Sequence, residues 1–144
     1  MDASPAAAAV AEANFAALGL GGRARVQIGR WGEGLKGAYD VIVSNPPYIA
    51  SGEIAGLDRA VREHDPRLAL DGGADGLDAY RWLAPDIARL LAPGGWCFVE
   101  IGAGQGDDVA ALLTAAGLVV TERRRDLGGV ERVLGGSLRA GAER

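Results

Sequence analysis

Hydrophobic and polar residues alternate along the chain in two patterns, which predict helices and strands in turn. Apolar residues three and four positions apart indicate helices, and short continuous apolar runs indicate buried strands. The pattern predicts helices over residues 5–18, 77–92 and 107–116, and strands over residues 25–28, 39–44, 96–101, 118–121 and 132–134. Helices and strands in this order predict an α/β fold built in layers.

Local signals mark several of the predicted ends. Ser4 is suited to cap the first helix, and Gly19 is suited to end it. Pro85 should kink or restart the helix over residues 77–92, because proline has no backbone N–H to donate. Pro93-Gly94-Gly95 predicts a turn before the next strand.

Two stretches carry more information than the others. Val41-Ile42-Val43 is continuously apolar, which is typical of a parallel strand covered on both faces. Residues 49–76 are rich in charged residues and glycine and predict a long loop or a broken helix. Loops of that length within a compact domain usually serve a function.

Composition and charge narrow the class of protein. The chain has 144 residues, 49% of them hydrophobic, which fits about one globular domain. Its net charge of -4 and pI of about 5.0 argue against a partner held through phosphate groups. Arg123-Arg124-Arg125 is the one dense basic cluster and is interpreted as a solvated strand edge.

Further features indicate a protein of the cytoplasm. Cys97 is a single cysteine within an apolar run, as expected of a buried thiol in a reducing compartment. The alanine-rich start has no basic segment of a signal peptide, and no stretch approaches the ~20 apolar residues that span a bilayer. We expect no metal site.

The strongest candidate site is Asn45-Pro46-Pro47-Tyr48, directly after the apolar strand over residues 39–44. Ligands of open α/β sheets bind at the carboxyl ends of the strands. The Asn45 side-chain oxygen and the Pro46 carbonyl are two acceptors for one NH2 group, and Pro47 restricts the direction of that carbonyl. Tyr48 offers a flat aromatic face. The alternative interpretation is a rigid turn that only ends the strand.

This tetrapeptide resembles the motif of class I methyltransferases that act on amide or exocyclic amino nitrogens. The sequences around it narrow the resemblance to the release factor glutamine methyltransferases. They are residues 42–49, 65–73 and 75–81, Glu100-Ile101-Gly102 with Gln105-Gly106, and residues 125–129 with Arg132-Val133. One mild departure is Asp65, which stands where the family has glutamate before Pro66.

The resemblance implies a reaction, a cofactor and a partner. The methyl donor would be S-adenosylmethionine, and the acceptor a glutamine side-chain nitrogen in a peptide chain release factor. Asn45, Pro46, Pro47 and Tyr48 would be the catalytic residues. The expected substrate is therefore a protein, with no membrane partner and with nucleic acid not expected as the direct substrate.

The resemblance also implies cofactor-binding residues. Asp2 stands where the family has an acidic residue that accepts hydrogen bonds from the ribose hydroxyls. Trp31 matches a tryptophan near the adenine, although Arg30 occupies the position of the acidic residue that precedes it in the family. Trp31 is thus either a stacking wall or a core residue. Asn45 would address the reacting end of the cofactor.

The same resemblance implies a partial domain. Class I enzymes order their strands 3-2-1-4-5-7-6, and this chain is expected to supply strands 3 to 7 of a Rossmann-like sheet truncated at its N-terminus. Residues 1–144 would then form a partial catalytic domain without the first two strands, the glycine-rich cofactor loop and the N-terminal helical domain. On that interpretation these residues alone would bind S-adenosylmethionine poorly.

Three alternatives stay open at this point. The first is a nucleic-acid methyltransferase that acts on an adenine or guanine amino group. The second is an inactive fragment that at most associates with other chains. The third is a circularly permuted enzyme in which Gly102-Ala103-Gly104-Gln105-Gly106 is the cofactor loop, because this run follows a strand and precedes a helix.

Overall fold

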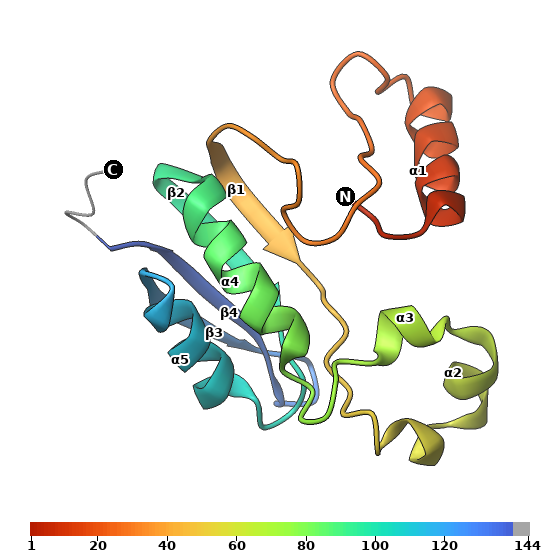
Figure 1. Ribbon diagram of the computed structural model, residues 1–144, viewed down its shortest axis with the longest axis vertical. Coiled ribbons are helices and arrows are strands. Elements are labelled where there is room, and N and C mark those ends of the chain that lie inside the picture. The colour runs from red at the N-terminus through yellow and green to blue at the C-terminus, as the bar shows by residue number, and fades with distance from the viewer. Residues whose placement is uncertain (140–144) are drawn as a thin grey trace. The chain divides into compact units, whose positions relative to one another are not determined.

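The computed structural model describes residues 1–139 and divides into two compact units (Figure 1). The first unit is Met1–Lys36, and the second begins at Gly37. The prediction of one partial catalytic domain over residues 1–144 stays a prediction.

The first unit consists of one helix and the loop that follows it. Helix α1 spans Pro5–Ala17, and the Ser4 hydroxyl oxygen caps it by accepting a hydrogen bond from the Ala7 N–H. The chain leaves the helix through Gly19, whose φ of +67° is accessible to glycine at little cost. The predicted helix and both of its end signals are confirmed.

The predicted strand over residues 25–28 is wrong. Only Ile28 pairs there, in a single parallel bridge with Asp2. The Asp2 N–H donates to the Gln27 carbonyl at 3.1 Å, and the Gly29 N–H donates to the Asp2 carbonyl at 3.0 Å. The segment beside residues 25–28 ends where α1 begins at Pro5, so there is no neighbour long enough for a ladder.

The second unit contains a mixed sheet of four strands in the order β1-β2-β4-β3. The strands are β1 (Tyr39–Ser44), β2 (Leu91–Glu100), β3 (Leu118–Arg125) and β4 (Glu131–Leu138). β1 pairs parallel to β2, and β4 pairs antiparallel to both β2 and β3. The order corresponds to the 4-5-7-6 part of the class I arrangement.

Local details of the sheet differ from the predictions. β3 and β4 each extend about four residues beyond the predicted runs, because they pair with each other along their length. The turn expected at residues 93–95 lies instead within β2, where the register with β1 shifts between Tyr39 and Val41. Gly94 has a φ of +79° in this irregular stretch.

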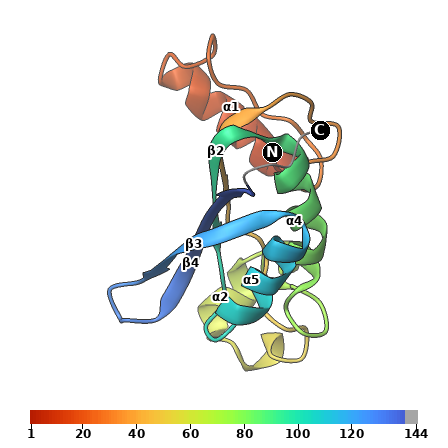
Figure 2. The same cartoon turned by 90° about the vertical axis from the view of Figure 1, so that its left-hand side faces the viewer.

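Two helices cover one face of the sheet. Helix α4 spans Asp78–Leu90 and helix α5 spans Gly106–Ala115, and both lie on the same side of the strands (Figures 1 and 2). Pro85 lies inside α4 without ending it, so the predicted restart does not occur. The helices and the strands beneath them bury a core that includes Tyr80, Leu83, Ile87, Cys97, Val99, Val109, Leu113 and Leu134.

The opposite face of β1 and β2 is not covered as the apolar run predicted. Val41 and Val43 are 59% and 73% exposed, because α4 and α5 both pack on the other face. Val41 pairs with Trp96 and Val43 with Phe98, which places all four side chains on this open face. The Trp96 and Phe98 rings stack with their centroids 6.1 Å apart.

Residues 49–76 form the predicted broken helix. They contain the 3-10 turn η1 (Ile54–Gly56) and the short helices α2 (Arg59–His64) and α3 (Arg67–Leu70). No residue in these three pieces is buried. No helix within residues 1–139 combines the length and apolar character needed to cross a bilayer.

Two smaller predictions about side chains are confirmed. Cys97 is 1% exposed, and burial raises the pKa of its thiol. Arg123, Arg124 and Arg125 lie exposed on the edge strand β3. Arg123 pairs with two carboxylates, of Asp107 at 2.9 Å and Glu131 at 3.2 Å, so the arginine cluster is partly neutralised within the chain.

Ile87→Ala is expected to destabilise the second unit by about 2–5 kcal/mol, because it opens a cavity under α4. Ile87 is 1% exposed, whereas Trp82 on the same helix is 68% exposed. Trp82→Ala is the matched control and should change the free energy of unfolding by less than about 0.5 kcal/mol. Denaturant unfolding measures both, and equal losses would contradict the packing described.

Candidate active site

The Asn45-Pro46-Pro47-Tyr48 motif directly follows the carboxyl end of β1. Because β1 and β2 are parallel, with Ser44 paired to Val99, both strands end at the same edge of the sheet. Asn45 therefore enters the same region as Glu100, the last residue of β2. Long-range pairing brings these polar residues together where α/β sheets bind ligands.

Two acceptor oxygens of the motif have no partner within the described chain. Asn45 is exposed and its side chain forms no hydrogen bond within residues 1–139. Pro46 is buried, yet no donor among those residues reaches its carbonyl oxygen. Neither oxygen is therefore occupied by a donor of the described chain.

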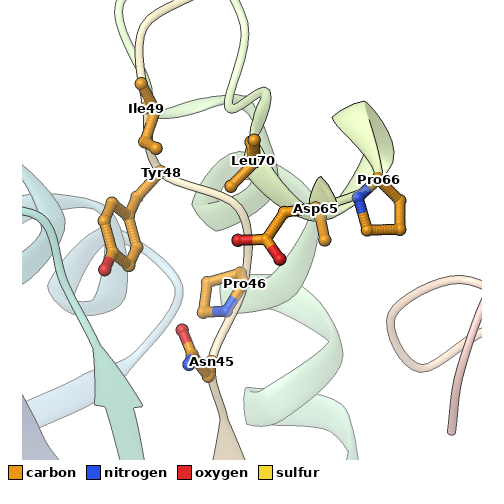
Figure 3. Close-up of a pocket in the computed structure, with 8 residues that line it drawn as sticks. Asn45, Pro46, Tyr48, Ile49, Asp65, Pro66 and Leu70 are labelled. Atoms are coloured by element: carbon orange, nitrogen blue, oxygen red, sulfur yellow. The ribbon is translucent and has the colours of Figure 1, made fainter. Parts of the chain in front are cut away.

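The motif borders a cavity of about 250 Å³ (Figure 3). The motif and the residue after it form one part of the lining, and residues of the α2–α3 segment form the other. The lining residues are Asn45, Pro46, Tyr48, Ile49, Asp65, Pro66, Ala69 and Leu70. In Figure 3 the Asp65 carboxylate points toward Pro46.

Hydrogen bonds to the end of β2 hold the aromatic side of the site. The Tyr48 hydroxyl donates to the Glu100 carboxylate at 3.3 Å, and the Tyr80 hydroxyl donates to the Glu100 carbonyl at 3.0 Å. Burial and then the negative charge of Glu100 raise the pKa of Tyr48, against an opposing effect of Arg132. Burial also raises the pKa of Tyr80 well above its usual value. Both phenols therefore remain neutral donors at neutral pH.

Backbone pairing holds the cavity wall after the motif. The Ile49 N–H donates to the Leu70 carbonyl at 3.0 Å, and the Gly72 N–H donates to the Ile49 carbonyl at 2.8 Å. Asp71 accepts from the Ser51 hydroxyl at 2.6 Å, and this hydrogen bond is the main reason that the pKa of Asp71 is lowered. These bonds join residues 48–51 to the segment that ends α3.

The predicted cofactor-binding residues Asp2 and Trp31 lie in the first unit. The Asp2 carboxylate is exposed and accepts the Ser4 N–H at 2.8 Å. Trp31 is half-buried and has a φ of 53°, the single positive value of a non-glycine residue within residues 1–139. Such a conformation is costly and often accompanies a functional site. The cofactor role of both residues stays a prediction.

Residue chemistry alone did not assign Glu100, Gln105 and Asp65 to the site. Glu100 and Gln105 were named through the resemblance, and Gln105 also as part of a possible cofactor loop. Their contacts with Tyr48 span 52 and 57 residues. A carboxylate that ends an apolar strand parallel to β1 was a usable signal for Glu100. No group of three or more potential metal ligands occurs in the part of the chain that the structure describes.

Comparison with curated proteins identifies close relatives. The chain is 52% identical to a protein of Rhodospirillum rubrum over 134 residues, which are 93% of the chain and 41% of that protein. It is 50% identical to proteins of Bradyrhizobium diazoefficiens and Caulobacter vibrioides, of which it covers 45% and 47%. All three are named release factor glutamine methyltransferase. No family model matches the chain.

Solved structures share the fold at low sequence identity. A ribosomal protein L11 methylase from Lactobacillus delbrueckii matches 96% of this chain and 55% of its own, with a TM-score of 0.66 and 18% identity. A TehB-like SAM-dependent methyltransferase from Corynebacterium glutamicum matches 95% of this chain and 65% of its own, with a TM-score of 0.58 and 17% identity.

The strand order and the motif after β1 define the fold of a class I S-adenosylmethionine-dependent methyltransferase. Within that class, the chain is about 50% identical to proteins named release factor glutamine methyltransferase and matches their C-terminal part. It spans about half the length of the curated relatives it matches.

The two tyrosines at the site predict a pH dependence of stability. Their pKa values in the folded protein lie above the ordinary value of 10.0, so the folded state holds the phenol protons more tightly than the unfolded state does. This contribution to stability is complete below about pH 10 and is lost as the pH rises through the folded pKa values.

A variant with both Tyr48→Phe and Tyr80→Phe should therefore lose less stability than the parent between about pH 9 and 11. Thermal unfolding across that range measures the difference. Both proteins share Cys97 and all other groups that titrate there, so they serve as each other's reference. If the stability of both proteins fell in parallel over this pH range, the raised pKa values of Tyr48 and Tyr80 would be contradicted.

Proposed function

We propose that this chain supplies the methyl-acceptor site of an enzyme that methylates a glutamine side-chain nitrogen in peptide chain release factors. The observation that carries the proposal is the pair of oxygens of Asn45 and Pro46. Asn45 and Pro46 both line the cavity, and neither oxygen has a hydrogen-bond partner within residues 1–139. A glutamine side-chain amide carries the two N–H donors that such a pair accepts.

The amide nitrogen needs this arrangement because its lone pair is delocalised into the carbonyl group. The Asn45 oxygen and the Pro46 carbonyl would each accept one N–H, which fixes the plane and direction of the nitrogen. Their partial negative charges also stabilise the positive charge that develops on the nitrogen as the new bond forms. After transfer the nitrogen releases one proton to solvent.

The residues present fit a role in binding S-adenosylmethionine. This cofactor supplies a methyl group bonded to a positively charged sulfur atom. One Asp2 oxygen accepts the Ser4 N–H, and the other carboxylate oxygen suits a ribose hydroxyl. Trp31 offers a flat face for the adenine, and the Tyr48 ring a π surface for a cationic group. The proposed cofactor-binding residues are thus Asp2 and Trp31 in the first unit, and Asn45 and Tyr48 in the second.

The charge of the cavity favours a protein substrate over a nucleic acid. Asp65 is the single charged residue among those that line the cavity, and the chain has a net charge of -4. Both features repel phosphate groups, which dominate binding to nucleic acids. Release factors act on the ribosome, so the proposed reaction takes place in the cytoplasm.

Asn45→Ala is expected to lower the rate of methyl transfer about 100-fold or more, because one of the two acceptors is lost. Stability should change little, since Asn45 is exposed. The assay measures methyl transfer to release factor by the intact polypeptide that carries this sequence. Asn14→Ala makes the same chemical change at an exposed position of α1 and serves as control. Near-normal turnover of the Asn45 variant would contradict the proposed role of Asn45 as an acceptor.

The acceptor class has its own test. With S-adenosylmethionine labelled in the methyl group, label should pass to the glutamine side chain of a purified release factor and not to DNA or ribosomal RNA. Amino-acid analysis of the labelled product identifies the modified side chain. Label that appears in nucleic acid alone would show that the acceptor is a base amino group.

A further inference from the structure

The Gln105 side chain joins three separate loops behind the candidate active site. Gln105 occupies the cap position of α5, but its side chain makes no cap hydrogen bond to that helix. Its carbonyl oxygen accepts the Gly102 N–H at 3.0 Å, while its NH2 group donates to the Tyr48 carbonyl at 3.0 Å and the Gly76 carbonyl at 3.3 Å. All of the contacts that its amide makes are therefore directed toward the loops around Tyr48.

Glycines create the space that this side chain fills. A Cβ atom on Gly102 would lie 2.7 Å from the Gln105 side-chain oxygen and 3.1 Å from the Tyr48 ring. A Cβ atom on Gly76, which has a φ of +75°, would lie 2.6 Å from the Gln105 nitrogen. On Gly72 it would lie 2.9 Å from the Pro47 carbonyl oxygen. At Gly72 and Gly76 the neighbouring atoms include backbone of the motif, which cannot move aside, so only glycine fits at these two places.

Few torsions separate the Tyr48 carbonyl from the proposed acceptor oxygens. The rings of Pro46 and Pro47 fix both of their φ angles, and Pro47 holds Pro46 in extended geometry. Upstream, the ladder between β1 and β2 fixes the chain at Ser44. Downstream, Gln105 fixes the Tyr48 carbonyl, and Leu70 fixes the Ile49 N–H.

We infer that Gln105 is a positioning residue of the methyl-acceptor site. Its amide holds the Tyr48 peptide group and thereby sets the direction of the Asn45 and Pro46 oxygens. The inference rests on the proposed methyl transfer, and it gives the glycine-rich run over residues 102–106 a role other than cofactor loop. An amide is required because the side chain must accept one N–H and donate to two carbonyl oxygens.

The test uses Gln105→Glu, which has nearly the same shape but places a negative charge against two carbonyl oxygens. Its kcat should fall at least about tenfold, because misaimed acceptors cost rate. The KM for release factor and the Kd for S-adenosylmethionine should change by less than about threefold, because the substitution removes no group that is proposed to contact either of them. Gln105→Met, similar in length and uncharged, repeats the test if the charge disturbs folding. Asn14→Asp makes the same amide-to-carboxylate change on the exposed face of α1 and should leave all constants unchanged.

A double-mutant cycle separates positioning from general stabilisation. If Gln105 acts through the two acceptors, Gln105→Glu should lower the rate much less in a protein that already carries Asn45→Ala. Equal effects in both backgrounds, or a loss in parallel with a lowered unfolding temperature, would overturn the inference. A defect confined to cofactor affinity would also overturn it and would assign the run over residues 102–106 to the cofactor.

Amide hydrogen exchange tests the same contact without any activity. Gln105→Met removes the hydrogen bonds of the amide. Exchange at the Ile49 N–H should then become at least about tenfold faster, while the Leu113 N–H in α5 keeps its rate. Unchanged exchange at Ile49 would show that Gln105 does not hold this loop. If the parent protein transfers no methyl group to glutamine, the proposed function fails, and exchange alone then decides whether Gln105 positions the motif.

Discussion

The parallel pairing of β1 with β2 is the constraint on which the site depends. It aligns the ends of two strands separated by more than 40 residues, so that the motif after Ser44 meets Glu100. The pairing is stabilised from one side, where α4 packs on β2 and where Cys97 and Val99 are buried. An aligned edge gives the motif a fixed base, and the remaining hydrogen bonds need only orient what projects from it.

Polar groups around the motif divide into those that are satisfied internally and those that are not. The Tyr48 hydroxyl and carbonyl both have partners, in Glu100 and Gln105. The Asn45 side chain and the Pro46 carbonyl have none within residues 1–139. Unpaired acceptors at the border of a cavity are costly unless solvent or a ligand meets them. The groups with internal partners therefore hold the site in place, and the groups without them are the ones left to bind a substrate.

The sequence predicted features that local chemistry determines. The cap at Ser4, the end of β1 before the motif and the short helices within residues 49–76 all follow from residues close in the chain. Features that depend on a partner from a distant part of the chain were predicted less well.

An apolar run such as Val41–Val43 has the same sequence pattern whether helices cover one face of the strand or both. The strand expected over residues 25–28 had β-forming residues but only Asp2 to pair with. Pro85 breaks a helix in isolation, whereas packing against the sheet keeps α4 continuous.

The uneven burial around the cavity has a consequence for divergence among proteins of this kind. On one side, Gly72 and Gly76 approach the backbone of the motif so closely that an added Cβ atom would collide with it. On the other, α2 and α3 contain no buried residue, so replacing their side chains removes little packing energy. Drift and selection can therefore rework the helical wall at low cost while the motif stays fixed. If the cavity came to accept a different substrate group, the first substitutions would therefore be expected in residues 59–70.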